Sequence, residues 1–329
     1  KDPENNVTRY VYDGLSRLIY TLDGSNALTK RYYDGDGNVT AVERFSDFQT
    51  ENINLTVSEK SSTKFEVTLG LADIDAWLTN EESIINFTLY DAANKPNFTI
   101  SATGEVTEFL YDNYGRIIQK IDYATTIAVT SALKHQLLDG TAEVNTVKPS
   151  LNTTKDMVTA TVYNENSQAV YSLQKTTSGQ AIVKQSIYNK AGLLIETIAY
   201  ANTIAYKANA AEHDIAEAIS TNSEADRHSY LIYDQAGRVR FSINGQGAVT
   251  ETKYNLTGRP SQIIERSSLY AANLPKTLEA LTTQYGQVTL STDRVTNTFY
   301  DAAGNIEKTI DGEGHIESWT YFKNGLKSS

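Results

Sequence analysis

The sequence predicts a mainly β fold, in which stacked β-hairpin repeats form a spiralling ribbon, shell or rod and short helices lie in the inserts. A tyrosine followed by a turn signal, mostly Asp or Asn first, recurs ten times. Apolar and polar residues alternate around these positions, so that Thr107, Phe109 and Tyr111 fall on one face. The 21 tyrosines among 329 residues also favour strands, because aromatic side chains suit half-buried sheet surfaces.

The repeat consists of a tyrosine, an Asp or Asn, a short turn and usually a glycine three residues beyond the Asp or Asn. Clear copies are Tyr33-Asp34 with Gly37, Tyr111-Asp112 with Gly115 and Arg116, Tyr233-Asp234 with Gly237 and Arg238, and Tyr300-Asp301 with Gly304. Weaker copies are Tyr12-Asp13, Tyr90-Asp91, Tyr163, Tyr188 with Gly192, Tyr254 with Gly258 and Arg259, and Tyr321 with Gly325. We expect all of these to be structural repeat positions.

The copies fall into pairs, and a second turn signal lies between the two tyrosines of most pairs. In four pairs the tyrosines stand 21 residues apart, whereas Tyr163 and Tyr188 are stretched by four. The second turn is read at Asp23-Gly24, Thr103-Gly104, Asn244-Gly245 and Asp311-Gly312. Asp-Gly or Asn-Gly between alternating runs predicts β-hairpins with tight primed turns, in which glycine and asparagine supply positive φ. We expect the turn aspartate to accept hydrogen bonds from backbone amides.

Longer inserts separate the pairs and define a larger period. An aromatic residue stands twelve residues after the second tyrosine at Phe45, Tyr123 and Tyr200, while Tyr270 is displaced. Ala124, Ala201 and Ala271 follow the last three, and an acidic residue closes each insert seven before the next tyrosine, at Asp156, Asp226 and Asp293. We predict one continuous repeat array with super-repeats at about 5–82, 83–155, 156–225, 226–292 and 293–329, cut within a repeat at both ends and open at both edges.

Helical spacing appears inside the inserts. Leu274, Leu278 and Leu281 stand at i, i+4 and i+7 beside Pro275; the segment 211–219 is rich in alanine; and Leu133 and Leu137 precede Asp139-Gly140. The first insert, with Ile74 to Leu78, shows the weakest pattern. We therefore expect a short helix in each of the last three inserts.

A lone hairpin is only marginally stable, so each unit needs its neighbour. We expect aromatic rungs from successive units to lie against one another, so that neighbouring units, and not any single unit, supply the fold.

The Tyr-Asp-x-x-Gly-Arg pattern, clearest from Tyr111 to Arg116 and from Tyr233 to Arg238, resembles the tyrosine-aspartate repeat family, also called Rhs repeats. Similar repeats occur in bacterial polymorphic toxins, in the B and C components of insecticidal toxin complexes, in wall-associated proteins and in animal teneurins. The resemblance covers nearly the whole chain. It implies a β ribbon that spirals into a hollow shell, which in toxin systems encloses a passenger; the sequence lacks the aspartate-rich self-cleavage segment and the C-terminal toxin domain of such shells.

Composition and motifs narrow the function. A formal charge of -11 argues against nucleic acid as a partner, and the chain has no cysteine for disulfides or thiolate metal sites. No apolar run could span a membrane. The four histidines lack metal-ligand spacing, Asp34 to Asn38 departs from a calcium loop at Val39 and Phe45, and no nucleophile or cofactor motif occurs. We predict no catalytic residue, no metal and no cofactor.

The prediction is therefore a non-catalytic structural segment of a giant secreted or surface bacterial protein with these repeats, not an enzyme. Two alternatives are a fragment of a toxin-encapsulating shell and an adhesive module that binds glycans or cells. The expected partners are neighbouring repeats of the parent protein or further copies of it, an enclosed toxin passenger, or surface glycans. The secreted or cell-surface location is implied by the resemblance alone.

Overall fold

The computed structural model describes residues 8–24, 27–45, 56–61, 64–68, 78, 83–285, 289–322 and 327. The chain divides into two compact units, Lys1–Val158 and Thr159–Ser329. None of the helices in the described ranges is long and apolar enough to span a membrane.

The first unit is an antiparallel sheet in which each strand pairs with the next, in the order β1-β2-β3-β4-β7-β8-β9-β10. Its strands are β1 (Arg9–Tyr12), β2 (Leu18–Leu22), β3 (Leu28–Tyr33), β4 (Val39–Phe45), β7 (Ser83–Tyr90), β8 (Pro96–Ile100), β9 (Val106–Tyr111) and β10 (Ile117–Asp122). A separate hairpin, β5 (Thr56–Ser61) with β6 (Lys64–Thr68), stands in the first insert.

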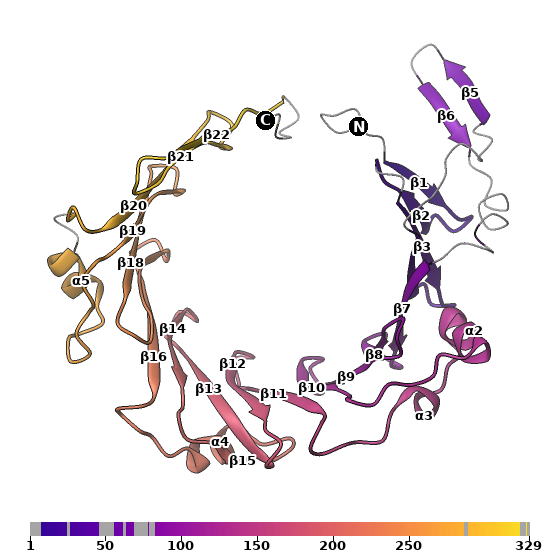
Figure 1. The fold of residues 1–329 in the computed structure, drawn as a ribbon, viewed down its shortest axis with the longest axis horizontal. Helices are drawn as coiled ribbons and strands as arrows, with labels where there is room; N and C mark the ends of the chain where they lie inside the picture. The colour runs from indigo at the N-terminus through magenta and orange to yellow at the C-terminus, as the bar shows by residue number, and fades with distance from the viewer. Residues whose placement is uncertain are drawn as a thin grey trace. The chain divides into compact units, whose positions relative to one another are not determined.

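The second unit repeats the same antiparallel plan from β11 to β22. Its strands are β11 (Met157–Tyr163), β12 (Ala169–Lys175), β13 (Gln180–Tyr188), β14 (Leu194–Ala199), β15 (Ile204–Ala205), β16 (Arg227–Tyr233), β17 (Val239–Ile243), β18 (Val249–Tyr254), β19 (Pro260–Glu265), β20 (Arg294–Tyr300), β21 (Ile306–Ile310) and β22 (Ile316–Ser318). Successive hairpins pair across the inserts, β14 with β16 and β19 with β20 (Figure 1). The predicted mainly β fold of repeated hairpins with short helices is confirmed.

The hairpin turns differ from the primed type that the sequence suggested. In the first copy the N–H of Asp13 donates to the carbonyl of Arg17 and that of Ser16 donates to the carbonyl of Asp13. Positive φ occurs at the fourth turn residue, such as Gly37 at 90°, and not at Gly35 directly after the aspartate. This geometry is a type I turn followed by a left-handed residue and a bulge, and the strand register indeed shifts beside the repeat tyrosines from Tyr12 to Tyr300.

The prediction of primed turns is therefore wrong. A primed turn needs positive φ at one or both central residues. The turn found here needs it only at its fourth residue, where most copies of the repeat carry glycine. The same turn forms at the second turn signals, for example at Ser101 to Gly104 and Asn244 to Gly247.

Short helices occupy the last three inserts, as predicted. They are α2 (Ser131–Asp139), α3 (Val144–Val147), α4 (Glu212–Ala218) and α5 (Leu278–Tyr285). Leu274 lies before α5 and not inside it, because Pro275 and the loop that follows delay the helix start. In the first insert the residues from Ile74 to Trp77 lie outside the described ranges, and the hairpin β5–β6 is an element that the sequence analysis missed.

The third and fourth inserts each pack onto one face of the sheet and close a local core. One cluster joins Ile215 of α4 to Leu173 and Val183, and another joins Leu281 and Tyr285 of α5 to Phe241 and Ile243. Figure 1 shows α5 lying along one side of the sheet in its unit. In the first unit Leu78 packs against a cluster of Tyr20, Leu22, Leu28 and Phe45. Each of these three clusters stays within one super-repeat. The second insert differs, because its helix α2 lies against the first super-repeat, where the hydroxyl of Thr40 on β4 donates to the carbonyl of Leu138.

Leu281 and Leu274 offer a matched test of the insert core. Leu281 is fully buried in α5, whereas Leu274 is 37% exposed in the preceding loop. We expect Leu281→Ala to lower the free energy of unfolding by about 2–5 kcal/mol, because it leaves a cavity, and Leu274→Ala to change it by less than about 1 kcal/mol. Urea denaturation followed by circular dichroism measures both. Equal losses for the two variants would contradict the assignment of the core.

Candidate functional site

The candidate site is the row of repeat tyrosines, which stand where successive hairpins stop pairing. Strand pairing between successive hairpins ends at equivalent residues each time. The last pair joins the residue eight positions after one repeat tyrosine to the residue three positions before the next. Examples are Tyr20 with Lys30, Glu196 with Tyr230 and Phe241 with Glu251. Backbone pairing between hairpins therefore ends three residues before the tyrosine.

The tyrosine hydroxyl forms a bond between the hairpins beyond this point. In eight copies the hydroxyl donates a hydrogen bond to the carbonyl of the residue six positions after the preceding repeat tyrosine. The bonds are Tyr33 to Leu18, Tyr90 to Val39, Tyr111 to Pro96, Tyr188 to Ala169, Tyr233 to Leu194, Tyr254 to Val239, Tyr300 to Pro260 and Tyr321 to Ile306, at 2.6–3.0 Å. The tyrosine side chain therefore supplies a hydrogen bond between two hairpins at a place where their backbones no longer pair.

A cation from the preceding copy lies over the tyrosine ring in several copies. The guanidinium carbon of Arg238 is 4.3 Å from the centroid of Tyr254, and Arg17 is 4.7 Å from Tyr33. Lys95 over Tyr111 and Arg259 over Tyr300 repeat the arrangement. These cations stand five residues after a repeat tyrosine, so ring and cation come from consecutive copies.

The turn aspartate holds both the turn and this cation, which confirms its expected role in capping backbone amides. Oδ1 of Asp234 accepts the N–H groups of Ala236 and Arg238 at 2.9 and 3.0 Å, and Oδ2 accepts Nε of Arg238 at 2.8 Å. Burial opposes ionisation, but the hydrogen bonds from Arg238 and Ala236 outweigh it and lower the pKa of Asp234. Asp112 with Arg116 and Asp13 with Arg17 have the same geometry.

The predicted repeat positions from Tyr12 to Gly304 lie at these turns, whereas residues 323–326, which follow Tyr321 and Phe322, lie outside the described ranges. Gly37, Gly115, Gly192, Gly237, Gly258 and Gly304 have positive φ, and in the weaker copies Ser16, Asn94 and Ser167 take that conformation. Gly325 lies outside the described ranges.

The expectation that aromatic rungs lie against one another is wrong. The repeat tyrosines are half-buried or exposed, and among the described residues the ring pairs in contact are His228–Tyr230 and Tyr270–Tyr285. The rings are separated because each occupies the gap between two hairpins and meets a carbonyl and, in several copies, a cation. Neighbouring hairpins are joined by these tyrosine contacts and by strand pairing, while each of the three apolar clusters lies within one super-repeat.

The aspartate that closes an insert ties its two ends together. Oδ1 of Asp226 accepts the N–H of Ala201 at 2.8 Å, and Oδ2 accepts the N–H of Asn222 at 2.7 Å. Asp156 does the same with Ala124 and Asn152, and Asp293 with Ser267 and Leu290. We call this contact the insert clasp. The sequence pattern predicts where these aspartates stand but not their backbone partners.

In the fourth insert, Tyr270 and Ala271 are not the equivalents of Tyr200 and Ala201, contrary to the expectation from the sequence. The N–H of Arg266 bonds to the carbonyl of Val249, as that of Tyr200 bonds to Val183, so Arg266 and Ser267 are the equivalents of Tyr200 and Ala201. Tyr200 contacts Gln185, and at the same positions Arg266 pairs with the buried Glu251. Tyr123, at the same place in the second super-repeat, also meets a carboxylate, that of Glu108, so a carboxylate partner is compatible with either residue there.

A buried ionic group forms around Arg266. Its Nη1 is 2.8 Å from Oδ2 of Asp293, and Arg240 reaches Oε1 of Glu251 at 2.5 Å. Burial opposes ionisation of Asp293, but the amides of Ser267 and Leu290 and the Arg266 guanidinium lower its pKa to about 2. These charges are engaged with one another or with backbone, as buried charges must be.

Within the described ranges, no group of three His, Cys, Asp or Glu is placed to hold a metal ion. Asp34, which begins the calcium-like run, uses Oδ1 for the N–H groups of Asp36 and Asn38.

Comparison with known proteins gave structural neighbours only. Crystal structures entitled TcdB2-TccC3-Cdc42, TcdB2-TccC3 without the hypervariable C-terminal region, and TcdB2-TccC3-TEV match 99, 99 and 97% of the chain at 15, 14 and 10% identity, with TM-scores of 0.43, 0.42 and 0.45. The chain spans 14, 14 and 16% of the length of those chains. No protein-family model and no curated protein matches the chain.

Removing one tyrosine hydroxyl tests the bond between hairpins. We expect Tyr254→Phe to lower the free energy of unfolding by about 0.5–1.5 kcal/mol, since it deletes the hydroxyl that bonds to Val239 but keeps the ring. Tyr10→Phe is the control, because Tyr10 is a 55% exposed strand residue outside the repeat positions. Chemical denaturation that shows no difference between the two variants would refute the structural role of the hydroxyl.

The clasp at Asp293 predicts a specific acid sensitivity. Its pKa is about 2 in the fold against an ordinary 3.8, so its stabilisation is complete above pH 4 and is lost as the pH falls towards 2. After allowance for solvent screening we expect a contribution on the order of 1–2 kcal/mol. Asp293→Asn should lower stability at pH 7 and reduce the loss between pH 4 and 2, which denaturation at several pH values measures. An unchanged pH profile would count against the clasp.

Proposed function

We propose that this chain is a non-catalytic scaffold segment of a large secreted or surface protein of the tyrosine-aspartate repeat family. The observation that carries the proposal is the hydroxyl–carbonyl bond made by eight repeat tyrosines, each of which joins one copy to the copy before it. A structure in which every unit binds its neighbour in the same way can be lengthened by adding units. Its partners are then neighbouring repeats of the same protein or further copies of it.

The polar side chains of the repeat support architecture more than chemistry. The pKa of Asp13 is lowered by the backbone N–H and side chain of Arg17, and that of Asp234 is lowered by Arg238. A general acid or base works best with a pKa near the working pH, whereas these carboxylates stay ionised and hold turns.

A shell that encloses a toxin passenger is the second candidate, and the one-sided covering of the sheet favours it. In the second unit Leu173 and Phe241 face the inserts, while the alternating residues Ser172 and Ser242 lie on the face without inserts. That polar face leaves room for a passenger. Protection of a downstream domain of the parent protein from added protease would support enclosure, and ready digestion of that domain in the intact protein would oppose it.

Excising one super-repeat tests the scaffold. Removing residues 226–292 joins Ala225 to Asp293, so that Asp293 takes the place of Asp226 and Tyr300 that of Tyr233. We expect β14 to pair with β20 and the shortened chain to unfold cooperatively, with a melting temperature within a few degrees of the parent, because the third and fourth super-repeats each have a core of their own. Thermal circular dichroism and size-exclusion chromatography measure this.

Removal of residues 230–295 is the matched control. This deletion is one residue shorter and leaves an extra residue within the joined strand, which turns the following side chains to the opposite face. We expect this variant to aggregate or to melt far earlier. If the excision of 226–292 behaved like the control, the modular scaffold would be rejected.

A further inference from the structure

A cross-strand row on the face without inserts occurs at the same place in the third and fourth super-repeats. In the fourth, Thr250 on β18 lies directly opposite Glu265 on β19, and Glu265 lies directly opposite Arg294 on β20. These residues alternate with Val249 and Ile264, which are buried on the insert face. The fourth row therefore holds a carboxylate beside an arginine.

The equivalent row of the third super-repeat lacks the carboxylate and has a second cation. Lys184 on β13 lies directly opposite Ala199 on β14, and Ala199 lies directly opposite Arg227 on β16. All three are exposed. Because neighbouring strands are ~4.8 Å apart, the backbones at Lys184 and Arg227 are about 10 Å apart, with the methyl group of Ala199 between them. Two long cationic side chains can therefore converge over an alanine.

These two cations have no carboxylate of their own. Within the described ranges neither Lys184 nor Arg227 has a carboxylate oxygen within 4.0 Å. The carboxylate of Asp226, next to Arg227 in the chain, is engaged by the amides of Ala201 and Asn222. In a chain with a formal charge of -11, this unpaired couple of cations favours an anionic ligand.

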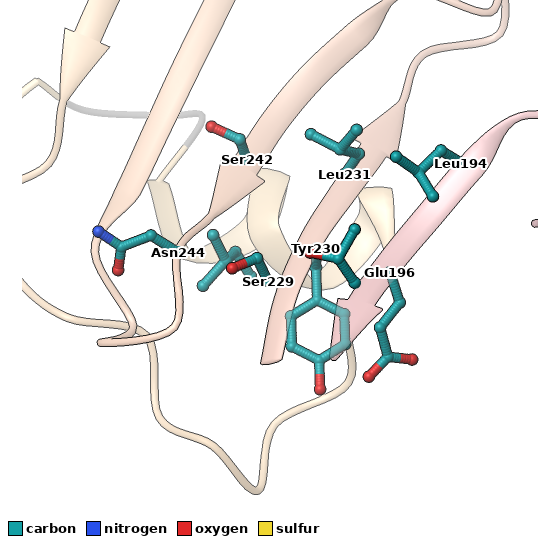
Figure 2. Close-up of a pocket in the computed structure, with 9 residues that line it drawn as sticks. Leu194, Glu196, Ser229, Tyr230, Leu231, Ser242 and Asn244 are labelled. Atoms are coloured by element: carbon teal, nitrogen blue, oxygen red, sulfur yellow. The ribbon is translucent and has the colours of Figure 1, made fainter. Parts of the chain in front are cut away.

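A hollow of about 230 Å³ adjoins the row at the place where β14 and β16 stop pairing. Figure 2 shows the side chains of Leu231 and Ser242 on one side of these strands, and the carboxylate of Glu196 beside the ring of Tyr230 on the other. On that other side Oε1 of Glu196 is 2.6 Å from Nδ1 of His228. The lining also includes Leu194, Thr197 and Ser229. The hollow thus offers leucine side chains and hydroxyls on the face that carries the two cations.

The hollow and the row are two to four residues apart along the strands. Thr197 and Ala199 lie on one face of β14, and Leu231, Ser229 and Arg227 alternate along the same face of β16. Two residues of a strand span roughly 6.6 Å, and two residues of an extended peptide span the same distance. A peptide that lies along these strands can therefore place an apolar side chain in the hollow and a carboxylate between the cations.

We infer that the third super-repeat and its junction with the fourth bind an extended acidic peptide of a partner protein, which carries an apolar side chain two to four residues from a carboxylate. The carboxylate takes the place that Glu265 has in the fourth row. The hollow is smaller than the ~300–1,000 Å³ of small-molecule sites and suits one side chain, and the hydroxyls around it can bond to a peptide backbone. This inference goes beyond the scaffold and does not depend on it, because a scaffold needs no unpaired cations.

The test is isothermal titration of the intact 329-residue chain with the peptide acetyl-Leu-Ser-Glu-Ser-Glu-amide. We expect a Kd below about 100 μM, and binding at least about ten-fold weaker when both Glu are replaced by Gln or when Leu is replaced by Ser. Raising the salt concentration from about 50 to 500 mM should weaken binding of the acidic peptide, because salt screens exposed charges.

Two variants copy residues of the fourth super-repeat into the site. Ala199→Glu places a carboxylate opposite Arg227, as Glu265 stands opposite Arg294, and should weaken peptide binding at least about ten-fold while the melting temperature is unchanged or higher. Leu231→Thr makes the hollow polar, since Thr252 is its equivalent two residues before the next repeat tyrosine, and should weaken binding of the leucine peptide by a similar factor.

Arg294→Gln is the matched control, because it removes a cation from the fourth row, outside the hollow and the third row, and should leave binding unchanged. Absence of binding at millimolar peptide would overturn the inference. So would equal binding of the Gln peptide, full binding by Ala199→Glu, or tighter binding of an oligosaccharide of uronic acids, which would assign the cations to a polysaccharide. None of these results would touch the scaffold, which the excision of a super-repeat tests separately.

Discussion

The hydrogen bond from a tyrosine hydroxyl to a backbone carbonyl of the preceding copy is the interaction on which this structure depends. Each hairpin closes with a type I turn and a bulge, and its pairing with the next hairpin stops three residues before the tyrosine. Without a further contact, two successive hairpins would be joined only by the strand residues that lie farther from the tyrosine turns. Phenylalanine could fill the same gap, but only tyrosine can also satisfy the carbonyl that the missing strand pairing leaves open.

Two levels of organisation follow from this bond. At the lower level, turns, cations and tyrosines repeat with the hairpin and couple neighbours through polar contacts. At the higher level, an insert with its helix and clasp gives four strands a core of their own, as Ile215 and Leu281 do in the third and fourth super-repeats. The clasp fixes where an insert leaves and rejoins the sheet, and the strand pairs that flank the third and fourth inserts, β14 with β16 and β19 with β20, share one register.

The sequence was informative wherever one residue type has one local role. Aspartate and glycine at fixed offsets predicted the hairpin turns, and leucines at helical spacing predicted α2 and α5, because turn caps and amphipathic periods are local properties. Turn type was missed because Asp-Gly suits both a primed turn and the turn found here. The tyrosine bonds were missed because a ring that meets a carbonyl and a ring that meets another ring leave the same mark in a sequence.

Another error arose where only strand pairing reveals the partner. Arg266 stands where Tyr123 and Tyr200 stand in other super-repeats, and strand pairing is needed to see that these three residues meet Glu251, Glu108 and Gln185. The copies at Tyr163 and Tyr188, which carry Asn in place of the turn aspartate, had looked like weak repeats. In the structure they keep the full turn geometry, so their departure from the pattern is chemical and not structural.

The most direct measurement is hydrogen exchange, followed by mass spectrometry, on a chain in which the repeat tyrosines Tyr188, Tyr233, Tyr254 and Tyr300 are all phenylalanine. If their hydroxyls couple hairpins, strands β13 to β21 should keep their pairing but exchange in smaller groups, each with its own opening free energy. If the strands instead open together with the protection of the unaltered chain, the tyrosine bond is not what joins the repeats.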